Sequence, residues 1–204
     1  MSIRINGVDR ESKTHEYSST NFGMYHMQAN PNLYEPQRST DFEFVVTDLD
    51  GLTNISTGNT FENSQEVLRL SVITAPVPHF QINVLRQRRG NSVQTFAGTP
   101  EFQDGTIEVY DWIGSDSKSI LEAWQHQAYD VNTDKVGLLA DYKKQAYLIE
   151  YTPDKQKVRQ WVLYGCWVSN IQEQPYDHSE MQSERRITAT ITFDKAIPDQ
   201  TDLN

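Results

Sequence analysis

The residues of this sequence that could do chemistry are five histidines and one short run of hydrolase-type residues. The histidines are His15, His26, His79, His126 and His178. No two of them have the i, i+4 spacing that places two metal ligands on one helix face, so we expect no metal site. Residues 177–180 read Asp-His-Ser-Glu. Neighbours along a chain rarely place three side chains in relay geometry, and we therefore expect no catalytic role for this run.

The motifs of common enzyme classes are absent from the sequence. It contains no Gly-x-Ser-x-Gly elbow, no Gly-x-x-x-x-Gly-Lys phosphate loop and no Gly-x-Gly-x-x-Gly dinucleotide motif. The single cysteine, Cys166, can form no disulfide within the chain and lies in the aromatic stretch 161–167, where a thiol usually acts as a small apolar core residue. We expect a protein that is not an enzyme and that binds no cofactor.

The net charge of the chain argues against a protein that binds nucleic acid tightly. Eighteen basic and 28 acidic residues give a net charge of -10, whereas proteins that bind nucleic acid neutralise phosphates with an excess of Lys and Arg. The one dense basic cluster is Arg86, Arg88 and Arg89, just before Gly90. Arginines at a hairpin tip favour a solvated turn or a salt-bridge site between subunits over a nucleic-acid contact.

The elements that must position these residues belong to one domain. A chain of 204 residues with 37% hydrophobic residues can bury one sizeable core. Residues 1–40 are polar and irregular, and we expect an extended N-terminal arm there, followed by a β domain over residues 41–198 and a C-terminal tail over 199–204. No stretch approaches the roughly 18 apolar residues of a membrane span, so we expect no membrane partner.

Alternation of apolar and polar residues predicts strands along the β domain. The expected strands cover residues 41–48, 67–74, 79–86, 106–112, 145–152, 157–169 and 185–193. In 79–86 the apolar alternate residues are expected to cover a core, while Gln81 and Asn83 share the other face. In 185–193 the corresponding polar face is formed by Thr188, Thr190 and Thr192.

One helix is expected, with Asp116 or Ser117 as its N-cap. Ser119 and Glu122 have the spacing of a capping box, and the apolar stripe of the helix includes Trp124. Trp124 and Trp161 are expected in the core. About seven strands and one helix, without regular alternation between them, predict an all-β fold with one flanking α-helix, as an antiparallel β-sandwich or barrel.

Residues 119–137 resemble the tail-tube proteins of contractile-tailed, myovirus-type bacteriophages. In that family a helix with a tryptophan leads into a Tyr-Asp pair and a Thr-x-Lys-Val type loop. The matching residues here are Trp124, Tyr129, Asp130, Thr133, Lys135 and Val136. The hairpin that follows is similar too, with a return strand that passes through Gly165 and Trp167, and residues 42–46 are similar to the first core strand. The resemblance touches most of residues 41–193.

The resemblance implies antiparallel sheets with a flanking helix, six copies to a ring, and rings stacked into a tube through which DNA passes without specific binding. It implies as partners the chain itself, sheath proteins and baseplate proteins, and as location the virion tail, assembled in the host cytoplasm. The polar faces at Gln81 and Asn83, and at Thr188 to Thr192, are candidates for the channel lining. An ordinary solvated sheet predicts the same alternation.

Three other functions stay open at this point. A baseplate protein that initiates the tube would share the fold, and so would the tube protein of a bacterial injection system. A monomeric β-sandwich that binds carbohydrate or hydrolyses a substrate is the alternative from a different class. For the tube proteins, the expected subunit interfaces are the loop 131–141, the N-terminal arm and residues 199–204.

Overall fold

The computed structural model describes residues 3–5, 8–10, 37–114, 116–176 and 184–199. Contacts within the chain divide it into two units, residues 1–38 and residues 39–204. In the first unit, β1 (Ile3–Ile5) and β2 (Val8–Arg10) pair antiparallel as a short hairpin within the expected arm. The run 177–180 and the C-terminal residues 200–204 lie outside the described residues.

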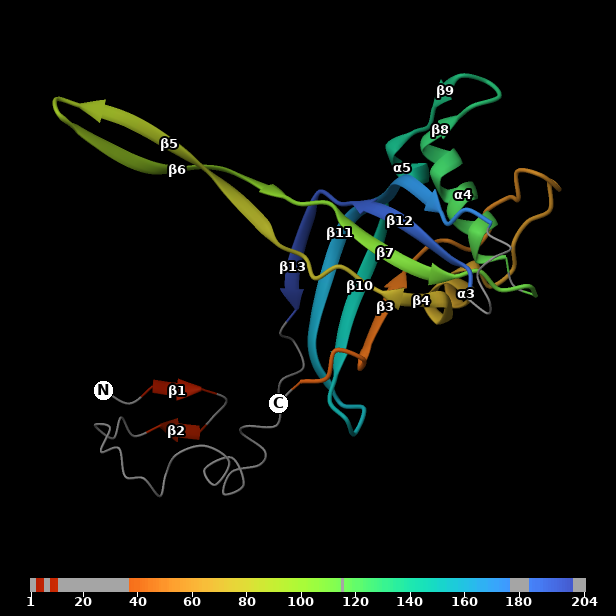
Figure 1. Ribbon diagram of the computed structural model, residues 1–204, viewed down its shortest axis with the longest axis horizontal. Helices are drawn as coiled ribbons and strands as arrows, with labels where there is room; N and C mark the ends of the chain where they lie inside the picture. The colour runs from red at the N-terminus through yellow and green to blue at the C-terminus, as the bar shows by residue number, and fades with distance from the viewer. Residues whose placement is uncertain (1–2, 6–7, 11–36, 115, 177–183, 200–204) are drawn as a thin grey trace. The chain divides into compact units, whose positions relative to one another are not determined.

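The second unit is built on one antiparallel sheet of seven strands. Its order is β3-β10-β11-β12-β7-β4, and β13 also pairs with β11. The strands are β3 (Phe42–Val46), β4 (Val72–Thr74), β7 (Gly105–Tyr110), β10 (Lys144–Tyr151), β11 (Lys157–Glu173), β12 (Arg186–Thr192) and β13 (Lys195–Asp199). The curled antiparallel sheet confirms the predicted all-β class (Figure 1).

Strand β11 is the centre of this sheet and bends at Gly165. Its first half pairs with β13 up to Tyr164, and its second half pairs with β12 from Trp167 onward. Gly165 has φ +70, a conformation that glycine adopts without steric cost. The turn between β12 and β13 lies opposite this bend, because the Asp194 amide donates to the Tyr164 carbonyl at 3.0 Å. The Lys143 ammonium holds the Asp194 carboxylate at 2.7 Å.

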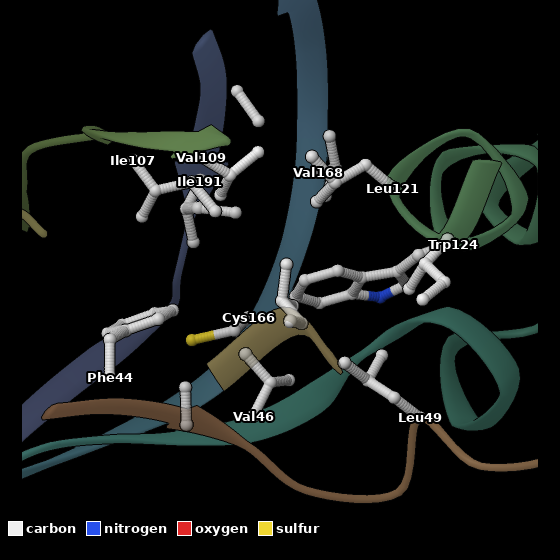
Figure 2. Packing of buried hydrophobic residues seen from close by; sticks show 14 of the residues in the cluster. Phe44, Val46, Leu49, Ile107, Val109, Leu121, Trp124, Cys166, Val168 and Ile191 are labelled. Carbon is white, nitrogen blue, oxygen red and sulfur yellow. The ribbon is translucent and has the colours of Figure 1, made fainter. Parts of the chain in front are cut away.

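Of the three described helices, the two longer ones pack on the inner face of the sheet, and the shortest packs against one of them. The three are α3 (Ser64–Ser71), α4 (Ser117–Ala128) and α5 (Leu139–Tyr142). Asp116 caps α4 by accepting from the Ser119 amide at 2.9 Å. Trp124 of α4 is fully buried and its indole N–H donates to the Tyr142 carbonyl at 2.8 Å. Figure 2 shows this indole beside Leu49, with Cys166 and Val168 of β11 next to it.

Several expected elements are different in the structure. The expected strand 67–74 is wrong for its first part, which belongs to α3. A short apolar run fits both a strand and a helix, and here Ser64, Leu68 and Ser71 face the core at spacings of four and three residues. The structure also adds α5, the strand β9 (Lys135–Val136) and the strand β13 in stretches expected to be irregular or at the chain end.

A long two-stranded ribbon projects from the second unit and forms no part of the seven-stranded sheet (Figure 1). It consists of β5 (Phe80–Arg89) and β6 (Ser92–Phe102), joined by a tight turn at Gly90. The expectation that Phe80, Ile82 and Val84 cover a core is wrong, because all three are largely exposed. Alternation identifies residues that share a face, but it does not show whether another element lies against that face.

The bend at Gly165 gives a test of the fold. In Gly165→Ala the new methyl group would overlap the Asp194 carboxylate at a positive φ, so we expect a loss of about 1–3 kcal/mol in the free energy of unfolding. Urea denaturation followed by circular dichroism measures this loss. The matched control is Gly114→Ala, where the added methyl group meets nothing within 4 Å. Equal denaturation midpoints for the two variants would show that the bend is not a constraint.

Candidate functional site

The β5–β6 ribbon exposes large apolar side chains on both of its faces. These side chains are 45–59% exposed and belong to Phe80, Ile82, Val84, Leu85, Val93 and Phe96. Leu85 and Phe96 are cross-strand partners on one face, and Val84 pairs with Ala97 on the other. A register shift between Ile82 and Val84 marks a bulge in the ribbon, and bulges increase the local twist of a strand pair.

Only the base of the ribbon is attached to the core. The Phe102 ring lies 5.6 Å from that of Phe80 and 6.0 Å from that of Phe193, measured between centroids. Beyond the base, no other strand of the described chain pairs with β5 or β6. An isolated two-stranded hairpin is marginally stable in water, and an exposed apolar surface of this size marks an interaction site. The ribbon therefore has the character of an interface that is not covered within one chain.

The end of the ribbon carries positive charge. Arg86, Arg88 and Arg89 lie next to the turn, and the Arg88 Nε donates to the Gly90 carbonyl at 3.3 Å. Within the described residues, none of these three arginines takes part in an ion pair. Their guanidinium groups are available to carboxylates of another molecule.

A second exposed apolar surface follows α4, and we call it the 129–139 loop. It contains the two-residue strands β8 (Tyr129–Asp130) and β9. Its exposed apolar residues are Tyr129, Val131, Val136, Leu138 and Leu139, of which Val136 is 76% exposed. Five such side chains within eleven residues are far more than scattered surface positions would give.

Local hydrogen bonds hold the 129–139 loop in shape. The Asp130 carboxylate accepts from the Thr133 hydroxyl at 2.6 Å and from the Asn132 amide at 2.9 Å, and these bonds lower its pKa. The Tyr129 hydroxyl donates to Asp134, which raises the tyrosine pKa. Gly137 lies so close to the Gln127 carbonyl that no side chain fits there. The polar groups therefore fix the loop, and the apolar ones are left to face outward.

The outer face of the main sheet is polar over three strands. In β12, Thr188 pairs with Glu108 and Gln172, and Thr190 pairs with Thr106 and Asn170. The intervening residues Ile187, Ala189 and Ile191 are buried on the core side. The polar face also includes Thr192. Arg186 at its end lies 3.6 Å from Glu108, so the charge of that arginine is balanced locally.

The structure separates the residues that the sequence grouped as a channel lining. Gln81 and Asn83 lie on the ribbon, where the Asn83 amide donates to Glu101 at 3.4 Å, whereas the threonines lie on the main sheet. The sequence does not predict the second strand of the ribbon, because its Gly98 and Pro100 are residue types that usually interrupt a strand. The apolar content of residues 92–102 was the available signal.

The tryptophans and the motif residues occupy three different environments. Trp124 lies in the core, while Trp161 is half-buried and packs against it. Trp167 is half-buried with its ring edge-on to Tyr142, at 5.7 Å between centroids. Tyr129, Asp130, Lys135 and Val136 pair across β8 and β9. The family-type motif therefore combines one core anchor with an exposed loop.

Two groups of side chains in the described part of the chain bear on metal binding and nucleophilic chemistry. This part of the chain contains no group of three or more His, Cys, Asp and Glu residues that could hold a metal ion. Burial raises the pKa of the Cys166 thiol to about 12, which leaves it protonated and unreactive at neutral pH. Among the described helices, none combines the length and the apolar character that crossing a membrane requires.

Comparisons with solved structures identify this architecture. No protein-family model and no curated protein matches the sequence. A chain from the sheath-tube complex of the extracellular contractile injection system PVC, in its extended state, matches with a TM-score of 0.56 at 11% identity, over 87% of this chain and 98% of that one. A chain from the PVC sheath/tube terminator in its extended state matches with a TM-score of 0.58 at 12% identity, over 82% of this chain and 99% of that one. A chain from the tube terminating cap of the anti-feeding prophage (AFP) matches with a TM-score of 0.57 at 10% identity, over 81% of this chain and 91% of that one.

These likenesses define the class of fold. The chain has the fold found in structural parts of contractile injection systems, as the resemblance to tail-tube proteins predicted. Identities of 10–12% show a shared fold, which is a statement about architecture.

The ribbon gives a test that separates folding from interaction. In Leu85→Ser/Phe96→Ser both members of an exposed cross-strand pair become polar. Because these side chains bury little within the chain, the free energy of unfolding should change by less than about 0.5 kcal/mol. The control Leu121→Ser, in the core, should lose at least about 3 kcal/mol. Chemical denaturation of dilute protein measures both, and a large loss for the ribbon variant would place the ribbon in the folding core.

Proposed function

We propose that this protein is a structural subunit of a contractile injection apparatus of the phage-tail type, and that its copies assemble into rings that stack as a tube. The observation that carries this proposal is the β5–β6 ribbon, which is well paired internally and exposes apolar side chains on both faces. Such an element is stabilised when a neighbouring molecule covers it. The fold shared with parts of the PVC and AFP assemblies supports the same role.

Self-association explains features that a monomer leaves without a use. Among the described residues, β3, β4 and β13 each pair with one strand only, and such open edges are hazards in a monomer but can pair or be covered in a closed ring. The 129–139 loop provides a further apolar surface. In this proposal the protein acts by assembly and carries out no catalysis.

The channel in this proposal is lined by the polar outer face of the main sheet. Thr106, Thr188, Thr190, Asn170 and Gln172 offer hydroxyl and amide groups to water and no net positive charge. DNA would pass such a surface with little retention, because each Lys or Arg that neutralises a phosphate adds counterion-release affinity. The net charge of -10 per subunit acts in the same direction.

Partners other than the chain itself follow from the same proposal. The PVC match comes from a sheath-tube complex, and a further match at a TM-score of 0.54 and 12% identity comes from the AFP baseplate. We infer that a sheath encloses the tube of this protein and that a baseplate begins it. The subunit would be made in the cytoplasm of the host cell and reside in the virion tail.

Assembly of the purified protein tests the proposal. Electron microscopy of concentrated protein should show hollow rings or tubes, and Leu85→Ser/Phe96→Ser should abolish them. The matched control Ile55→Ser removes an exposed apolar side chain outside the ribbon and should leave assembly intact. Single rings that never extend would favour a tube-initiating or tube-terminating component. A monomer at every concentration would contradict the proposal and favour the binding-module alternative.

The lining can be tested with added charge. Thr188→Lys/Thr190→Lys should preserve tubes but make them retain short labelled DNA, with retention that falls steeply as salt rises. Tubes of Thr188→Gln/Thr190→Gln serve as the neutral control and should retain no DNA, like the unmodified protein. Equal DNA retention by the lysine and glutamine tubes would show that this face lies away from the channel.

A further inference from the structure

Two surfaces of this chain complement each other in polarity and in charge. Residues 84–96 of the ribbon include three arginines and no acidic residue. Residues 129–141 include three aspartates and one lysine. Each segment also exposes several large apolar side chains. Apolar contact supplies affinity in an interface, and opposite charges select the partner and the orientation.

These surfaces do not meet within one molecule. The ribbon leaves the main sheet on one side, while β8 and β9 extend from the end of α4 in a different direction (Figure 1). No pairing joins the ribbon to β8 or β9 among the described residues. Two complementary surfaces on different parts of one chain favour a contact between copies.

We propose that the arginine-bearing end of the ribbon in one copy lies against the 129–139 loop of the next copy. This inference rests on the proposed function, because it identifies the contact through which the subunits join. The Leu85 and Phe96 side chains would cover Val136, Leu138 and Leu139. The ribbon arginines would pair with the carboxylates of Asp134 and Asp141, both of which are in exposed positions.

The charges favour this head-to-tail contact over a two-fold one. Two ribbon ends packed against each other would bring six guanidinium groups together, and like charges at an interface cost several kcal/mol. Two 129–139 loops would bring their aspartates together in the same way. A contact between different surfaces leaves a free ribbon at one end of a chain of copies and a free loop at the other, so it continues into a ring or a stack.

The contact can be trapped with engineered cysteines and a bismaleimide crosslinker. Val93→Cys places a thiol near the ribbon turn, and Leu138→Cys places one in the loop, both at largely exposed positions. The native Cys166 is buried and stays unreactive. A mixture of the two single variants should give covalent dimers only, and the double variant should give a ladder of higher multiples. The control Val93→Cys/Ile55→Cys should give no ladder.

Charge reversal supplies a second measurement. Arg86→Glu/Arg88→Glu in the double-cysteine protein should lower the yield of crosslinked product by roughly tenfold, because it places carboxylates against carboxylates. Efficient dimers from Val93→Cys alone would indicate a tip-to-tip contact and overturn the inference. Rings in the microscope without a crosslink between positions 93 and 138 would overturn it too, while the proposed function stands. Absence of both rings and crosslinks would refute the proposed function itself.

Discussion

The bend of β11 at Gly165 is the constraint on which the rest of the structure depends. The 17-residue strand pairs on one edge with both β12 and β13 because the turn between those two strands lies opposite the bend. A sheet that turns at this point encloses a core on its inner face, and Trp124 of α4 closes that core (Figure 2). The polar outer face of β12 follows directly, since alternate residues point away from the core.

The core and the exposed surfaces of this protein are formed by different parts of the chain. The buried core cluster contains no residue of the β5–β6 ribbon, of which only Phe102 at the base packs against it. The ribbon and the 129–139 loop consequently contribute little to the stability of the monomer and present apolar groups to solvent. Such a division allows the exposed surfaces to change while the fold is kept, which agrees with a shared architecture at 10–12% identity.

Net negative charge and local positive charge have distinct physical consequences here. The chain as a whole is acidic, which opposes retention of nucleic acid and favours solubility. The ribbon end reverses the sign, with three arginines close together. In a homo-oligomer this arrangement would attract the basic ribbon end of one copy to the acidic surface of a neighbouring copy. It would disfavour contacts between two ribbon ends.

The sequence by itself determined the all-β class, the capped helix with Trp124, and the hairpin of β10 and β11, because periodicity, capping residues and a Pro-Asp turn are local signals. It identified the partners on each strand face, such as Thr188 with Thr190. Only the tertiary structure decided what lies against each face. The alternation around Ile82 resembles that around Ile187, yet one residue is exposed and the other buried. The difference arises because the apolar face of β12 lies in the core, whereas among the described residues only β6 pairs with β5. The local sequence does not encode which distant elements pack together.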